Sequence, residues 1–207
     1  MRDKITMTAL VVSVLFLLTA ILSPLFVSLG WLQPMKTNTD LVQGLGSLPE
    51  GFAGGMSWSH PLGVEPGTGR DLFSRIITGI TTSLTVAFIA TMISVLLGTT
   101  LGIISGFSKG RLDWLISRFL DLVLSFPSTL MLLSLGPILV GRIATVMGTD
   151  SADNKAKIAF MALVLGFFGF PFFARIIRGQ VLSLREREFV EAAKSLGARS
   201  GRIYIKE

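Results

Sequence analysis

The charged segment from Ser183 to Gly197 has the residue types and spacing best suited to specific contacts with a partner. Ser183 and Glu186 have the three-residue spacing of a capping box, which predicts a helix start. Gly197 predicts the helix end, because glycine enters the left-handed conformation without steric cost. The apolar face of this helix would consist of Phe189, Ala192, Ala193 and Leu196. The pattern predicts an amphipathic helix that docks in a groove of another protein.

Enzymatic chemistry has few candidate residues in this sequence. There is no cysteine and a single histidine, His60, so thiol catalysis, disulfides and Cys/His metal sites lack their residues. The phosphate-binding pattern G-x-x-x-x-G-K-[ST] is absent, and a Ser-His-Asp hydrolase would have to use His60. We therefore expect no catalytic residue, no cofactor and no metal, and we expect a structural role for His60.

The composition is typical of a membrane protein. Half of the 207 residues are hydrophobic and only 15% are charged. The net charge of +6 comes mainly from basic residues beside apolar runs, which favours a positive-inside membrane topology over nucleic-acid binding. We predict an all-α polytopic membrane protein with lipid, and not nucleic acid, as a partner.

Four apolar runs are long enough to cross a bilayer core of ~30 Å. Residues 1–32 hold the first, and its apolar run is longer than the ~7–15 residues of a signal peptide, which is the alternative interpretation. The other spans are expected at about 78–106, 122–140 and 158–177. Residues 33–77 form a Gly- and Pro-rich external loop that could end in an interfacial helix at 72–77. Residues 78–207 form the core of the protein.

A stripe of small residues follows one face of the second span. Gly98, Gly102 and Gly106 recur every four residues. This spacing removes side-chain bulk along a helix, so that another helix can approach closely. We therefore predict a helix-packing site at these three glycines.

Charged residues and a proline mark the entrance to the third span. Arg118 and Asp121 lie three residues apart and can pair on one helix face, and we expect this pair at the membrane interface. Pro127 lies inside the expected span and should kink it, because proline lacks the N–H that a helix needs.

The distribution of basic residues predicts the topology. If the N-terminus is cytoplasmic, the inner segments hold most of the 19 Lys and Arg residues. Basic residues favour the cytoplasmic side, so the charged tail after the fourth span is also expected in the cytoplasm.

The tail resembles the conserved cytoplasmic loop of ATP-binding-cassette importer permeases. The matching residues are Glu191-Ala-Ala-Lys-Ser-Leu-Gly197, with Ile203 six positions later. Further matches are His60-Pro-Leu-Gly63, Gly69-Arg-Asp71, Ser74-Arg75, Ser83-Leu84, Asp113, Arg118, Asp121, Phe126-Pro127, Ala174-Arg175 and Arg178. Together they resemble the permease subunit of dipeptide, oligopeptide and nickel importers, from about residue 59 to 207. The sequence departs from that pattern at Val64-Glu65, at Gly169-Phe170-Pro171, at Glu207, and at Thr81, where an arginine is common.

The resemblance implies a function, a location and a set of partners. The family has six spans, so the four found here imply a chain truncated before spans five and six. Residues 183–207 would form the coupling loop to a cytoplasmic ATPase subunit, where ATP is hydrolysed. Glu191 would orient this loop, Ala192 and Ala193 would permit close approach, and Gly197 would make the turn. The other implied partners are a homologous second permease subunit and an external substrate-binding protein, at the inner membrane of a prokaryote.

Other functions remain open at this point. The transported solute could be a peptide, nickel or another small solute, because these importers share the same permease motifs. The charged tail could instead be a surface-bound amphipathic helix of a structural membrane protein. A channel or secondary carrier is less favoured, since the spans have no acidic residue near a midplane for ion coupling.

Overall fold

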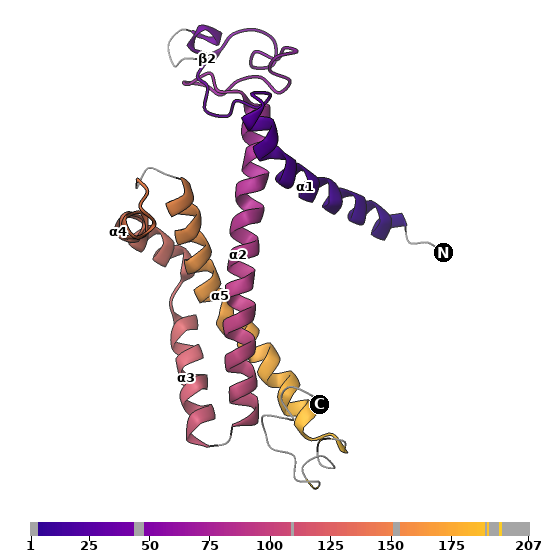
Figure 1. The fold of residues 1–207 in the computed structure, drawn as a ribbon, viewed down its shortest axis with the longest axis vertical. Coiled ribbons are helices and arrows are strands. Elements are labelled where there is room, and N and C mark those ends of the chain that lie inside the picture. Colours follow the sequence, from indigo (N-terminus) through magenta and orange to yellow (C-terminus); the bar gives the residue numbers. More distant parts are fainter. Residues whose placement is uncertain are drawn as a thin grey trace. The chain divides into compact units, whose positions relative to one another are not determined.

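The computed structural model describes residues 4–43, 48–108, 110–150, 154–188, 190 and 195. The chain divides into two compact units, Met1–Thr85 and Val86–Glu207, and helix α2 contributes to both. The elements are α1 (Lys4–Ser28), η1 (Thr39–Leu41), β1 (Val42–Gln43), β2 (Leu48–Pro49), α2 (Leu72–Phe107), α3 (Arg111–Ser125), α4 (Ser128–Met147) and α5 (Asn154–Arg185) (Figure 1).

Four of these helices are long and apolar enough to cross a membrane: α1, α2, α4 and α5. The 36 residues of α2 would extend about 54 Å at ~1.5 Å per residue, which exceeds a bilayer core of ~30 Å. In the described residues the only sheet is the two-stranded pair β1–β2, with Val42 opposite Pro49. The structure confirms the predicted all-α class with four candidate spans.

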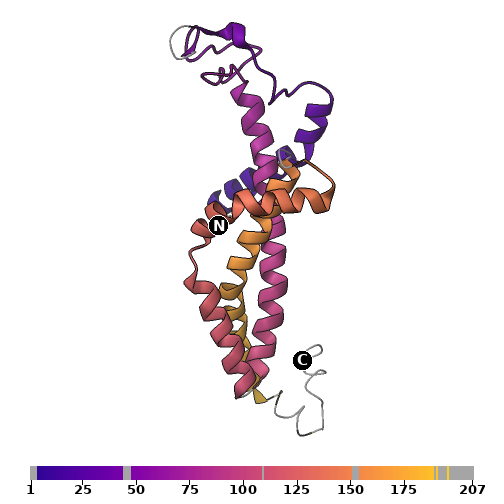
Figure 2. The same ribbon diagram turned by 90° about the vertical axis from the view of Figure 1, so that its left-hand side faces the viewer.

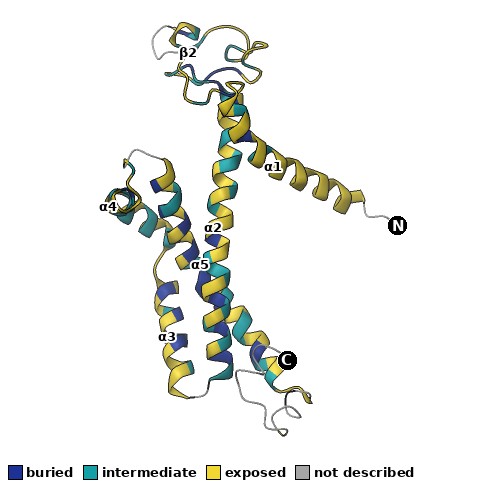
Figure 3. Cartoon of the chain, in the orientation of Figure 1, coloured by how far each residue is buried: buried dark blue, intermediate teal, exposed yellow. Residues whose placement is uncertain are grey.

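In the first unit, a side chain of α2 compensates for the proline inside α1. Pro24 has no N–H, so the carbonyl of Ala20, four residues earlier, loses its helical partner. The hydroxyl of Thr81 on α2 donates a hydrogen bond to this carbonyl oxygen at 3.1 Å. Most of α1 is exposed (Figure 3). Most of its exposed side chains are apolar, as expected of a helix whose solvent is lipid.

The start of α2 is fixed by Asp71, which is buried. Its Oδ2 accepts a hydrogen bond from the backbone N–H of Ser74 at 2.7 Å, and its Oδ1 lies 3.1 Å from Nδ1 of His60. This N-cap satisfies an N–H that the first turn leaves unpaired. The separate interfacial helix expected at 72–77 is wrong, because these residues are the first turns of α2.

The second unit has its core between α3 and α5. Ile116, Leu120 and Val123 recur at helical spacing on α3 and are buried. They pack against Phe170 and Ala174 of α5. Figure 3 shows the buried residues of α3 on the side that faces α2 and α5. The amphipathic pattern of α3 thus places it beside the apolar helix α5.

The chain turns between α3 and α4 instead of continuing as one kinked helix. The expected continuous span at 122–140 is wrong: α3 ends at Ser125, Phe126 and Pro127 are extended, and α4 begins at Ser128. Figure 2 shows α4 lying across the direction of α3 and α5. Proline disfavours the helical conformation of the residue before it, so Phe126 leaves the helix and the direction changes.

Candidate functional site

Glycines on α2 allow this helix to lie almost directly against the backbone of α5. A Cβ atom added to Gly98 would lie 2.7 Å from the Cβ of Phe173, and one on Gly102 would lie 2.7 Å from the carbonyl oxygen of Ala174. Gly106 is equally crowded. Cβ atoms essentially never come this close to other heavy atoms, so only glycine fits at these positions without a shift.

Small residues on α5 complement those of α2. A Cβ atom added to Gly166 would lie 2.7 Å from the Cβ of Ile93, and one on Gly169 would lie 2.7 Å from Oγ of Ser94. The Ser94 hydroxyl donates a hydrogen bond to the carbonyl of Gly166 at 2.9 Å. Close contact and an interhelical hydrogen bond therefore hold α2 and α5 together, as is common for helices in membranes.

A carboxylate on α3 joins three helices near one end of the second unit. Asp113 accepts hydrogen bonds from Nε of Arg178 on α5 at 2.9 Å and from its Nη2 at 2.8 Å. The hydroxyl of Ser105, which is buried on α2, also donates to Asp113. The hydrogen bonds from Arg178 hold the pKa of the Asp113 carboxyl below its ordinary value. The two-point contact fixes both side chains more firmly than a single charged contact would.

Asp121 forms a second, more exposed group of charges. It pairs with Arg175 of α5, and Nη1 of Arg118 lies 3.3 Å from its Oδ2. The structure thus brings Arg118 and Asp121 together, and their place at a membrane interface stays a prediction. All three side chains are more than 40% exposed, and such pairs contribute ~0–1 kcal/mol. The Asp113 group is therefore the stronger link between α3 and α5.

The end of α5 is tied to the end of α2. An Nη atom of Arg185 donates to the carbonyl oxygen of Gly106 at 3.2 Å. This carbonyl is among the last of α2, which ends at Phe107 and leaves such groups without helical partners. The backbone N–H of Arg187 then bonds to the carbonyl of Leu184 at 3.1 Å and turns the chain.

The capping box predicted at Ser183 and Glu186 is wrong. Ser183 is inside α5, and Glu186 follows Arg185, the last residue of that helix. The helix continues beyond its apolar run because Arg178 and Arg185 find partners on α3 and α2. The predicted coupling residues lie outside the described residues: Phe189, Glu191, Ala192, Ala193, Leu196 and Gly197.

Sequence reasoning missed three polar side chains of this unit. Ser105 lies in an apolar stretch that gives no signal for its bond to Asp113. The predicted helix start at Ser183 would place Arg185 in a separate helix, but Arg185 is the last residue of α5. Arg142 lies beyond the expected end of the third span at about residue 140, but it is inside α4, which extends to Met147. The left-handed Gly148 that follows α4 is the signal that could have placed this helix end correctly.

The residues of this unit also carry the match to known proteins. Residues 98–207 match the family described as binding-protein-dependent transport system inner membrane component. The chain belongs to this family. The match begins at Gly98, the first glycine of the close α2–α5 contact, and includes both charge groups and the tail.

Relatives of the inner membrane component extend the similarity across the chain. The dipeptide transport system permease protein DppC of Alkalihalophilus pseudofirmus is 33% identical over 98% of this chain and 57% of its own length. The oligopeptide transport system permease protein OppC of Bacillus subtilis is 29% identical over 99% of this chain and 57% of its own length. The glutathione transport system permease protein GsiD of Pectobacterium atrosepticum is 32% identical over 73% of this chain and 45% of its own length.

These similarities confirm the resemblance to dipeptide and oligopeptide permeases. The family and the four candidate spans identify a multi-pass inner-membrane transport component. The chain spans about half the length of these relatives.

Within the described residues, no group of three His, Asp or Glu side chains could hold a metal ion.

Proposed function

We propose that this chain is a permease subunit of an ATP-driven peptide importer and forms part of the translocation pathway. The family match over residues 98–207 carries this proposal. The relatives named above are permeases for dipeptides, oligopeptides and glutathione, which are all peptides. The proposed partners are a homologous second permease subunit, cytoplasmic ATP-binding subunits that hydrolyse ATP, and an external substrate-binding protein.

The N-terminus and residues 183–207 lie on the cytoplasmic side in this proposal. The excess of Lys and Arg in the segments assigned to that side supports it. The loop at 33–77 then faces outward. Reporter fusions after Gly110 and after Gly197 should both report the cytoplasm, and an external location of either fusion would overturn this topology.

The tail couples ATP binding to movement of the spans. Glu191 and Gly197 orient and turn a short helix that docks in a groove of the ATPase subunit. Just before this segment, Arg185 is bonded to α2 and Arg178 is bonded to α3. A displacement of the docked helix is therefore transmitted to three helices together. ATP favours one arrangement of the spans only as far as the partner binds that arrangement more tightly.

Parallel measurements of ATP hydrolysis and dipeptide uptake test the coupling in vesicles that contain the chain with its partner subunits. Replacing Gly197 with Val should leave ATP hydrolysis and abolish most ATP-dependent uptake, because a β-branched side chain opposes the left-handed turn. The matched control is Gly179→Val on α5, where an added Cβ has no neighbour within 4 Å. Unaltered coupled uptake in Gly197→Val would contradict the coupling role, and uptake of nickel without dipeptide would contradict the substrate class.

A further inference from the structure

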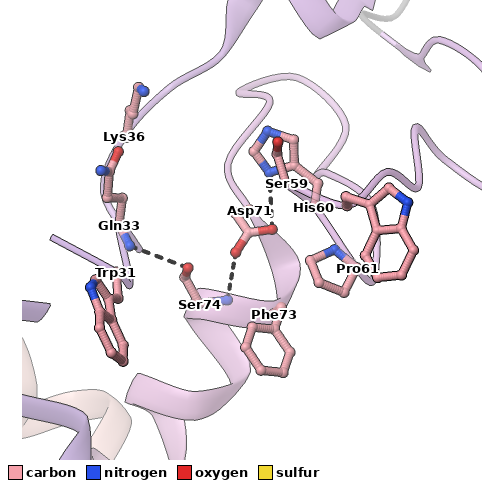
Figure 4. Close-up of a pocket in the computed structure, with 10 residues that line it drawn as sticks. Trp31, Gln33, Lys36, Ser59, His60, Pro61, Asp71, Phe73 and Ser74 are labelled. Carbon is pink, nitrogen blue, oxygen red and sulfur yellow. Dashed lines mark hydrogen bonds and ion pairs between the residues drawn. The ribbon is translucent and has the colours of Figure 1, made fainter. Parts of the chain in front are cut away.

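The first unit contains a pocket that the transport proposal does not use. It has a volume of about 550 Å³, within the range of small-ligand sites. Figure 4 shows Trp31, Gln33 and Lys36 along one wall, His60 and Pro61 along the other, and Asp71 and Ser74 between them. The first wall follows α1, and Asp71 and Ser74 belong to the start of α2.

The pocket lies where two candidate spans end. Helix α1 ends at Ser28, and Trp31 follows three residues later. Phe73 is the second residue of α2 and also lines the pocket. The backbone N–H of Gln33 donates to Oγ of Ser74 at 3.2 Å, which holds the two span ends together. Both helices are candidate spans, so a pocket at their joined ends would lie near one surface of the bilayer.

The charge available to a ligand in this pocket is positive. Both carboxylate oxygens of Asp71 already have partners, in His60 and in the backbone N–H of Ser74, and its side chain is only 9% exposed. Lys36 is exposed, and no carboxylate pairs with it in the part of the chain that the structure describes. An anion can therefore approach the Lys36 ammonium without displacing an existing ion pair.

The pocket walls are suited to an amphiphile. Trp31 is 74% exposed and Trp58 is fully exposed. Indole rings favour the membrane–water interface, where an apolar ring and an N–H donor are both satisfied. Leu29 directly follows α1, and Ile76 lies in the first turns of α2. Both are exposed, are close in sequence to the pocket residues Trp31 and Phe73, and offer apolar surface for an acyl chain.

We propose that this pocket binds the phosphate-bearing headgroup of an anionic phospholipid of the phosphatidylglycerol type. Lys36 contacts the phosphate, Trp31 and Phe73 contact the glycerol and upper acyl carbons, and the acyl chains follow α1 and α2. The bound lipid fixes the ends of both helices at the membrane surface. This site is independent of the transported solute and of the coupling tail.

Fluorescence quenching in lipid nanodiscs tests the proposal on the full chain. Trp58→Phe and Trp114→Phe leave Trp31 as the only tryptophan. Two series of discs are prepared from ordinary phosphatidylcholine. One series contains increasing fractions of brominated phosphatidylglycerol, and the other contains increasing fractions of brominated phosphatidylcholine. Brominated phosphatidylglycerol should quench Trp31 at lower mole fractions than brominated phosphatidylcholine. In Lys36→Gln the half-saturating fraction of phosphatidylglycerol should rise about five-fold, the effect of one cation near an anionic surface.

A matched control separates the pocket from general attraction of anionic lipid to a basic protein. Lys4→Gln makes the same change at the opposite end of α1 and should leave the preference for phosphatidylglycerol unchanged. Equal quenching by the two brominated lipids would overturn the proposal, and so would an equal loss in Lys4→Gln and Lys36→Gln. Inorganic phosphate added to phosphatidylcholine discs should not change Trp31 emission. If phosphate instead causes a saturable change in Trp31 emission and Lys36→Gln removes this change, the site binds soluble phosphate. That result would overturn the proposal of a lipid site.

Discussion

Arg178 on α5 donates two hydrogen bonds to Asp113 on α3, from Nε at 2.9 Å and from Nη2 at 2.8 Å. The two residues are 65 positions apart, and the contact closes the part of the chain that contains α3, α4 and most of α5. In the proposed permease this contact lies directly before the coupling tail. Its geometry therefore affects both the stability of the second unit and the transmission of movement from the ATPase.

Replacing Arg178 with Lys should lower the free energy of unfolding by about 1.5 kcal/mol, because an ammonium keeps the charge but loses the planar two-point contact. Thermal unfolding of the purified chain in detergent measures this effect. Arg118→Lys is the matched control, since the Arg118 side chain is 64% exposed in its pair with Asp121. The control should change stability by less than about 0.5 kcal/mol. Equal effects of the two changes would contradict a special role for the Asp113 contact.

Replacing Gly102 with Ala should lower the free energy of unfolding by about 1–3 kcal/mol through overpacking. The added Cβ would lie 2.7 Å from the carbonyl oxygen of Ala174, so α2 and α5 would have to separate. Gly79→Ala on the same helix has no neighbour within 4 Å and should be neutral or stabilising by up to about 1 kcal/mol. Denaturation midpoints of the two variants give the comparison. A Gly102→Ala variant as stable as Gly79→Ala would exclude close packing at this position.

The number and type of the spans were predictable from sequence because lipid imposes a simple requirement. Every backbone polar group in the hydrocarbon core must be bonded internally, so long apolar runs form helices. The exact helix ends depend on neighbours. Pro127 is compatible with a kinked helix or with a helix end, and the chain turns there so that α3 packs along α5 while α4 takes a different direction.

The charge pairs show a second limit of sequence reasoning. Asp113 and Asp121 on α3 each have two possible partners in Arg175 and Arg178 on α5. Charge alone does not decide between these pairings, because the outcome depends on the rotation and position of two packed helices. The structure pairs Arg178 with Asp113 and Arg175 with Asp121. The glycine spacing on α2 indicated a close approach, and the sequence did not identify α5 as the facing helix.

Replacing Thr81 with Val should lower the free energy of unfolding by about 1 kcal/mol, because the Ala20 carbonyl freed by Pro24 would lose the hydrogen bond from the Thr81 hydroxyl. The two side chains have nearly the same shape, so the change isolates the hydroxyl. Thr85→Val is the control, because the Thr85 hydroxyl bonds within its own helix, to the carbonyl of Thr81. Thermal unfolding in detergent compares the two. If both variants match the unmodified chain, the Thr81 contact does not stabilise α1 at Pro24.

The stability of the second unit should fall in acid because of Asp113. Its pKa is lowered from the ordinary value of 3.8, chiefly by the hydrogen bonds from Arg178. A carboxyl whose pKa is lower in the folded state stabilises that state fully above its unfolded pKa, and this contribution is lost as the pH falls through the folded pKa. Unfolding midpoints measured in detergent from neutral pH to below 3.8 should therefore decline in the unmodified chain. Asp113→Asn should be less stable at neutral pH and should approach the unmodified chain as the pH falls, because an amide does not titrate. A constant difference between the two chains at all pH values would show that the charge of Asp113 does not contribute to this link.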